Sequence, residues 1–122
     1  MSEETQVKLT DVGMIELPSF DVTPFIGKKV KIQNVTEHKG NFGYYVRIET
    51  EKVADFGDKE IRASKILGLH EDANGKIGWG ADTKLGVYLS KHKVTHYNDL
   101  VGKEVILQTK TNKDGVDFLD FN

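Results

Sequence analysis

The amino-acid sequence predicts a mainly β domain in which one α-helix lies between the third and fourth of five antiparallel strands. Five stretches are rich in β-branched and aromatic residues and alternate apolar with polar side chains, as half-buried strands do. Glycine and asparagine mark turns between them, and one stretch alone shows apolar residues at helical spacing. The predicted strands cover residues 28–37, 41–50, 60–69, 103–110 and 115–122.

The composition is that of an ordinary globular domain. The chain has 122 residues, 38% hydrophobic and 30% charged, which is enough for one domain with its own core. The absence of cysteine excludes disulfides, thiol chemistry and cysteine-bound zinc. No apolar run reaches membrane-spanning length, and the polar start of the chain does not resemble a signal peptide. We therefore expect a cytoplasmic protein without a membrane partner.

The charges divide the chain into an acidic N-terminal arm, residues 1–24, and a body, residues 25–122. Residues 1–26 contain one lysine and five acidic residues, a net charge of −4, whereas the whole chain carries −2, so the remainder is mildly basic at +2. Such a body is compatible with a polyanionic ligand. Pro18 and Pro24 interrupt the apolar residues of the arm. We therefore expect the arm to be extended and packed on the body.

The second predicted strand organises the body. Tyr44, Val46 and Ile48 alternate with Tyr45 and Arg47 along it. Because successive side chains of a strand point to opposite faces, the first three are expected to be buried and Arg47 to be exposed. The outward face then combines an aromatic ring with a guanidinium, a pair that suits a nucleic-acid base and its phosphate. An ordinary solvated strand face is the alternative.

The first and third predicted strands flank the second and are interpreted from the same alternation of apolar and polar residues. Val35 breaks the alternation of the first strand, which predicts a bulge near Asn34. A turn over residues 38–41 leads into the second strand, and a loop over residues 51–59 leads out of it. The third strand ends in an apolar pair, residues 66–67, that we expect to be buried on both sides.

The chain between the third and fourth strands contains the predicted helix. Residues 70–83 are rich in glycine, and Asn74-Gly75 indicates a small extra hairpin. The helix is predicted to run from residue 82 to about residue 94, with Asp82 or Thr83 as its cap. Its regularly spaced positions are Leu85, Tyr88, Leu89 and His92. A turn over residues 111–115 joins the last two strands.

A three-stranded meander, a helical connection and a terminal hairpin follow one another in the oligonucleotide/oligosaccharide-binding (OB) fold. The chain resembles the single-stranded DNA-binding members of this class over residues 25–122. The resemblance lies in GKKVKI, GYYVRIET, EIRASKILGL and LVGKEVIL. It implies a five-stranded OB-fold barrel with its helix between strands three and four. It also implies that the outer face of the first three strands, with the loops beside it, binds the ligand.

The expected partner is single-stranded DNA or RNA, with DNA favoured by the resemblance. Alternation places four cations and one ring on the outer face, including both arginines of the chain. The cations would meet phosphates, and the aromatic rings would stack on bases. Trp79 either closes over a base or plugs the open end of the barrel. The predicted nucleic-acid-binding residues are Lys29, Lys31, Lys39, Phe42, Tyr45, Arg47, Arg62, Ser64, Trp79 and Lys113.

No pattern indicates an enzyme, a metal site or a cofactor. His92 and His96 have a zinc-like spacing, but no glutamate lies between them and the pair crosses the end of the predicted helix. Gly75 to Gly78 matches the G-x-x-G loop of KH domains, but no helix precedes it. The acidic residues form no evident catalytic pair. The alternative function is a protein-interaction module of the same fold in a larger assembly, which the near-neutral net charge favours.

Overall fold

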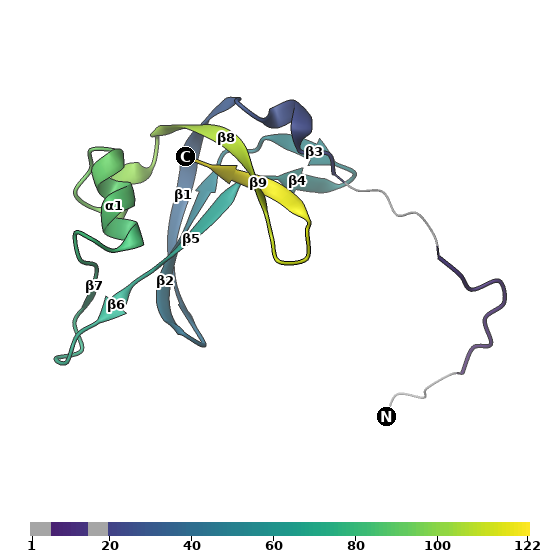
Figure 1. The fold of residues 1–122 in the computed structure, drawn as a ribbon, viewed down its shortest axis with the longest axis horizontal. Coiled ribbons are helices and arrows are strands. Elements are labelled where there is room, and N and C mark those ends of the chain that lie inside the picture. Colours follow the sequence, from purple (N-terminus) through teal and green to yellow (C-terminus); the bar gives the residue numbers. More distant parts are fainter. Residues whose placement is uncertain (1–5, 15–19) are drawn as a thin grey trace.

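A computed structural model describes residues 6–14 and 20–122 of the protein. This part of the chain is mainly β and contains one α-helix, α1 (Lys84–Lys91), with two 3-10 helices, η1 (Thr23–Phe25) and η2 (Tyr97–Leu100) (Figure 1). The strands are β1 (Lys29–Gly40), β2 (Gly43–Thr50), β3 (Ala54–Phe56), β4 (Lys59–Ile61), β5 (Ser64–Gly68), β6 (His70–Glu71), β7 (Ile77–Gly78), β8 (Glu104–Thr111) and β9 (Asp117–Phe121).

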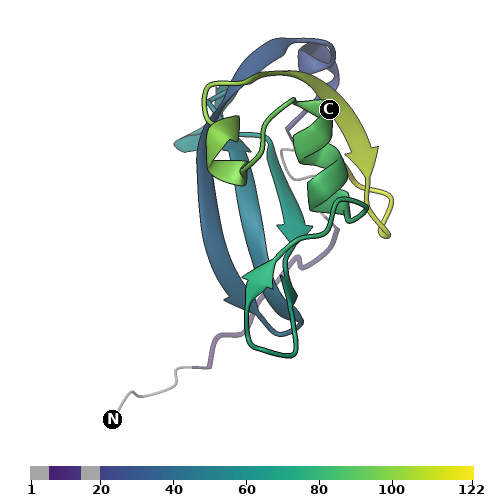
Figure 2. The same ribbon diagram turned by 90° about the vertical axis from the view of Figure 1, so that its left-hand side faces the viewer.

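Five of these strands form one antiparallel sheet in the order β5-β2-β1-β8-β9. The hairpins β3–β4 and β6–β7 are separate two-stranded sheets. The large sheet curves around the core, and α1 lies beside it near the C-terminal end of β9 (Figure 2). The predictions of a mainly β fold and of five main strands are therefore confirmed.

Over residues 20–122, the sheet does not close into the predicted five-stranded barrel. Within the described residues, β5 and β9 are the two edges of the sheet and no backbone ladder joins them. The two edges still lie in contact, and Lys65 Nζ of β5 lies 2.9 Å from Asp120 Oδ1 of β9. Both edge strands are only five residues long. An ion pair thus joins the edges where a closed barrel would have hydrogen-bonded strands.

The β1–β2 hairpin is longer than predicted. Gly40 pairs with Gly43, so the turn consists of two residues, and the predicted turn over residues 38–41 is wrong. Gly43 has a φ of +114°, a conformation that glycine adopts without strain. The register shifts between Ile32 and Asn34, which confirms the predicted bulge. Its consequence is that the residues of β1 beyond the bulge again alternate between the two faces.

The predicted third strand is divided into two. Residues 54–61, partly predicted as a loop, form the β3–β4 hairpin, and β5 begins only at Ser64. Between them, Ala63 is buried and its backbone N–H donates to Thr50 Oγ1 at 3.0 Å. The expectation that Ile66 is buried is wrong, because Ile66 pairs with Arg47 on the outer face and is 60% exposed, while its neighbour Leu67 is buried.

The core lies between the concave face of the sheet and α1. Val46 and Ile48 are fully buried and Arg47 is exposed, as predicted, whereas Tyr44 is only half-buried. The helix is shorter than predicted, and Thr83 Oγ1 caps it by accepting a hydrogen bond from the N–H of Gly86. Its buried positions are Leu85, Gly86, Tyr88 and Leu89.

The N-terminal segment joins the body at Phe20. Residues 6–14 are exposed and extend away from the sheet (Figure 1), so the expected packing of the arm does not hold for them. Phe20 stacks on Phe25 with ring centroids 5.3 Å apart, and Val22 is buried. Pro18 lies outside the described residues. None of the helices in the described ranges is long and apolar enough to cross a membrane.

Candidate nucleic-acid interface

The outer face of β1, β2 and β5 carries a stacked pair of rings. His38 of β1 and Tyr45 of β2 are cross-strand partners, and their rings are 5.2 Å apart and inclined by 18°. A 2.8 Å hydrogen bond joins His38 Nε2 to Thr36 Oγ1, two residues earlier on β1, and restrains the orientation of the imidazole. Tyr45 is half-buried and His38 is exposed. The hairpin thus holds Tyr45 in place while its ring remains accessible.

Arg47 lies next to this pair on the same face. It is the cross-strand partner of Thr36 on one side and of Ile66 on the other. Its Nε lies 4.0 Å from Glu49 Oε1, and its side chain is 47% exposed. An exposed ion pair at this distance stabilises the fold little, so the Arg47 guanidinium can exchange Glu49 for an anionic ligand. An aromatic, an aliphatic and a cationic side chain therefore adjoin one another.

The turn of the β1–β2 hairpin extends this surface. Phe42 is fully exposed there. A groove of about 430 Å³ runs from the turn along the outer face. Lys39 lies on the opposite face of the hairpin, with its Nζ 5.3 Å from the centroid of the Tyr44 ring. The groove is lined by Gly40, Asn41, Phe42, Gly43, Tyr44, Tyr45, Ile66 and Gly68.

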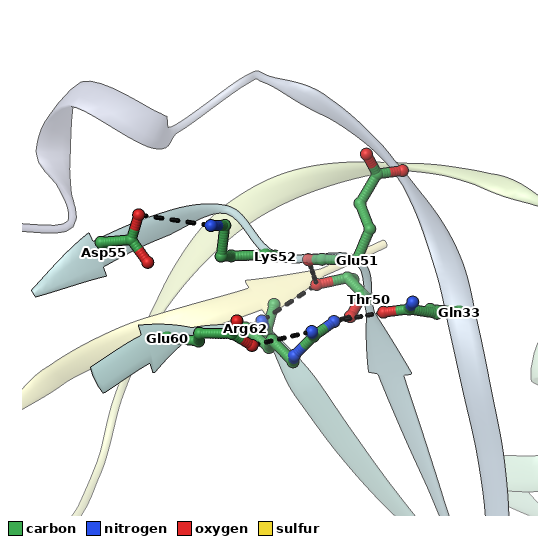
Figure 3. Close-up of polar contacts among 8 residues, drawn as sticks. Gln33, Thr50, Glu51, Lys52, Asp55, Glu60 and Arg62 are labelled. Atoms are coloured by element: carbon green, nitrogen blue, oxygen red, sulfur yellow. Dashed lines mark hydrogen bonds and ion pairs between the residues drawn. The ribbon is translucent and has the colours of Figure 1, made fainter. Parts of the chain in front are cut away.

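Arg62 lies outside the strands, whereas the predicted third strand included it. It lies in the bend between β4 and β5, and its guanidinium donates hydrogen bonds to Gln33 Oε1, to the Thr50 carbonyl oxygen at 3.2 Å and to Glu60 Oε2 at 3.0 Å (Figure 3). Its side chain is only 27% exposed. In the bend that breaks the third strand, Arg62 thus connects β1, β2 and β4 through these hydrogen bonds.

The other predicted residues surround the face without converging on it. Lys29 is exposed and lies 3.9 Å from Glu104 Oε1, and the exposed Lys31 is placed by a hydrogen bond from its backbone N–H to Glu51 Oε2. Lys113 is exposed in the turn between β8 and β9. Ser64 is half-buried and lines a separate, mainly apolar groove with residues of β9.

Trp79 follows β7 and packs against η2. Its ring meets those of His96 and Tyr97 edge-on, with centroids 5.4 Å and 5.5 Å away. It is half-buried against the core, and its remaining surface lines a cleft of about 420 Å³ beside β1. This position is compatible with both roles considered for Trp79. One side of the ring packs on the core, as a plug would, and the other lines the cleft, where a base could contact it.

The ionisable groups form no metal-binding cluster in the described part of the chain. No three histidine or acidic side chains in it lie close enough to hold a metal ion. His96 Nδ1 accepts a hydrogen bond from the N–H of Asn98 and so caps η2. Burial lowers the pKa of His92, whose Nε2 has no hydrogen-bond partner among the described residues. His92 is therefore a neutral side chain packed on Tyr88.

Four residues that lie on these surfaces were not among the predicted binding residues: His38, Ile66, Glu37 and Tyr97. His38 was assigned to a turn and Ile66 to the core, whereas both lie on the outer face. Continuing the alternation of β1 beyond the bulge would have placed His38 on the same face as Thr36, although not its pairing with Tyr45. Glu37 and Tyr97 are 60 positions apart, and no local pattern in the sequence links them.

Comparison of the chain with protein-family models, with curated proteins and with solved structures returned no match.

Proposed function

We propose that this chain is an OB-fold protein that binds single-stranded nucleic acid, DNA in preference to RNA, on the outer face of β1, β2 and β5. The observation that carries the proposal is the Tyr45–His38 stack beside an open groove and the exposed Phe42. Such rings accept bases of any sequence because every base has a π-face. The binding face is therefore expected to have little sequence preference.

The topology supports the same class. The sheet order β5-β2-β1-β8-β9, with α1 between β5 and β8 in the chain, is the strand order of an OB barrel opened at one seam. The two strands at that seam are the ones that Lys65 and Asp120 connect. In this class, the face of the second and third strands and the adjoining hairpin turns bind the oligonucleotide. Tyr45, Arg47 and Phe42 occupy those places.

The mechanism combines stacking with phosphate contacts. Tyr45 and Phe42 would each stack on a base, worth about 1–3 kcal/mol per base. Arg47 would meet a phosphate next to the stacked bases, and Lys29, Lys31, Lys39 and Lys113 would contribute longer-range attraction. Arg62 is left out of this set because its donors are engaged by Gln33, Thr50 and Glu60.

Anisotropy titrations with labelled oligo-dT, oligo-rU and duplex DNA at several salt concentrations test the proposal. Tyr45→Ala is expected to cost about 1–3 kcal/mol at every salt concentration, because it removes stacking and no charge. Arg47→Ala is expected to make the slope of log affinity against log salt shallower by about 0.7, because one fewer counterion-releasing contact remains. The two variants thus separate stacking from electrostatics.

Two variants serve as controls for these titrations. Tyr45→Phe keeps the ring and should bind like the wild type. Lys84→Ala removes one exposed positive charge at the start of α1, away from the face, and should leave the slope unchanged. If Tyr45→Ala binds like the wild type, the ring is not a stacking platform and the site is a generic basic surface.

A protein-interaction module is the second candidate. The exposed apolar side chains of Phe42 and Ile66, together with a net charge of −2, favour it. Apolar side chains at the centre of a patch are typical anchors of protein interfaces. Failure of the wild type to bind any of the three oligonucleotides at low salt would reject nucleic-acid binding and leave this alternative.

A further inference from the structure

A second surface lies on the opposite face of the β1–β2 hairpin. Beyond its short pairing with β8, the outer half of β1 pairs only with β2 among the described residues. The 3-10 helix η2 contacts β1, and β6 of the β6–β7 hairpin contacts β2 (Figure 2). They enclose the cleft of about 420 Å³ that Trp79 lines. This volume lies within the range of about 300–1,000 Å³ that is usual for small-ligand sites.

The walls of the cleft are aromatic. Tyr44 and Tyr45 are successive residues of β2 and project to opposite faces. The cleft adjoins the stacking platform, because Tyr44 also borders the outer groove and His38 also lines the cleft. Trp79 and Tyr97 meet edge-on at 5.5 Å and line it with Tyr44. Lys39 Nζ lies 5.3 Å from the centroid of the Tyr44 ring. A flat ring between these walls would have apolar neighbours and an ammonium group near its edge.

One carboxylate, that of Glu37, lines this aromatic cleft. The Tyr97 hydroxyl donates a 2.6 Å hydrogen bond to Glu37 Oε2. Burial, followed by the hydrogen bond to Glu37 and its charge, raises the pKa of Tyr97 to about 12. The hydroxyl therefore stays protonated and remains a donor at neutral pH. Because a carboxylate offers about four lone-pair sites and Tyr97 uses one, Glu37 retains the capacity to accept two further hydrogen bonds.

We propose that this cleft takes one unstacked guanine of the bound strand, with Glu37 accepting hydrogen bonds from guanine N1–H and N2–H. The proposal rests on the proposed function, because the base arrives as part of a single strand held on the outer face. Guanine presents two adjacent donors on this edge, whereas thymine and uracil present one N–H between two carbonyl oxygens that a carboxylate repels. Lys39 would then meet the phosphate of that nucleotide.

Affinity for three oligonucleotides tests the inference. They are a short oligo-dT, the same strand with one central guanine, and the same strand with one central inosine, which lacks the N2 amino group. The guanine strand is expected to bind about tenfold more tightly than oligo-dT, as one bidentate contact provides, and the inosine strand to fall between them. Trp79 is the only tryptophan of the chain, so quenching of its fluorescence by the guanine strand reports directly on the cleft.

Glu37→Gln is the decisive variant. Glutamine has the same shape but presents an amide donor where guanine also donates, so the ratio of guanine-strand to oligo-dT affinity should fall close to one. Asp58→Asn is the matched control, because it removes one exposed carboxylate from the β3–β4 turn and should keep the wild-type ratio. Glu37 is exposed, and equal melting temperatures of the two variants would establish that both are folded.

The outcomes separate the two proposals. Equal affinity of the wild type for the guanine strand and for oligo-dT would overturn the guanine site, while the binding itself would still support the proposed function. A guanine preference that survives Glu37→Gln would also overturn it. Loss of binding to every strand would reject both proposals together.

Discussion

Asp120→Asn tests whether the ion pair at the seam of the sheet holds its two edges together. Lys65 Nζ lies 2.9 Å from Asp120 Oδ1, and it also lies 5.6 Å and 5.3 Å from the ring centroids of Tyr88 and Phe121. The variant keeps the shape of the side chain and removes its charge. Lys65 is then left as an ammonium group among aromatic rings, with no carboxylate beside it.

The expected loss of stability follows from the burial of the pair. Removing one partner of a buried ion pair costs about 3–5 kcal/mol. The side chains of Lys65 and Asp120 are 19% and 9% exposed, so solvent screens the pair slightly and the lower end of the range applies. A loss of about 3 kcal/mol corresponds to a fall in melting temperature of roughly 10 °C for a domain of this size. Chemical and thermal unfolding measure both quantities.

The same pair predicts a pH dependence. Burial opposes the charged form of Asp120, but the hydrogen bond from Lys65 and the one from the backbone N–H of Phe121 outweigh it and lower the pKa of Asp120. The contribution to stability is therefore complete above the unfolded value of about 3.9 and is lost as the pH falls through the folded value. The difference between wild type and Asp120→Asn should be constant near neutral pH and shrink below about pH 4.

An exposed pair on the same sheet provides the control. Glu104→Gln removes the partner of Lys29, a pair separated by 3.9 Å with side chains 69% and 57% exposed, and should cost less than about 1 kcal/mol. The double variant Lys65→Met/Asp120→Leu should recover much of the stability, since apolar side chains can replace a buried ion pair. If Asp120→Asn unfolds at the same denaturant concentration as Glu104→Gln, the seam does not depend on this pair.

Three further predictions concern other parts of the chain. Gly86→Ala should unfold the helix region or shift it, because the new Cβ would lie 2.1 Å from the Gly80 carbonyl oxygen; a melting temperature equal to the wild type would contradict this. Arg62→Ala should lower stability by about 1–3 kcal/mol through its lost hydrogen bonds, and unchanged unfolding would show that the Arg62 contacts are dispensable. Deleting residues 1–14, which carry a net charge of −2, should tighten oligonucleotide binding at low salt, whereas weaker or equal affinity would show that this segment does not compete for the site.

Local periodicity in the sequence was sufficient to predict which face of an element is buried. Alternation assigned Val46 and Ile48 to the core and Arg47 to solvent. Helical spacing identified Leu85, Tyr88 and Leu89 as the buried positions of α1, although the helix ends earlier than predicted. These predictions succeed because the side-chain direction repeats every two residues in a strand and every 3.6 in a helix, whatever the element packs against.

Contacts between distant parts of the chain were decided by the tertiary structure alone. Arg62 becomes a structural residue because the bend beside Ala63 brings it to Gln33, Thr50 and Glu60. Ile66 is exposed because it pairs with Arg47 on the outer face. The His38–Tyr45 stack depends on the exact pairing of two strands across a bulge. A single-residue change of register would move each of these side chains to the other face, and the sequence pattern of one strand does not encode its partner's register.

The cleft beside β1 is the clearest example of a site that the sequence pattern does not predict. Glu37 and Tyr97 come from segments 60 positions apart, and Trp79 comes from a third. Each residue, taken in its own segment, has an ordinary structural role as a polar strand residue or a half-buried ring. Their common cleft exists because η2 packs against β1 while the β6–β7 hairpin packs against β2 through β6. The sequence thus determined the faces of the elements, and the packing of the elements determined which faces form a site.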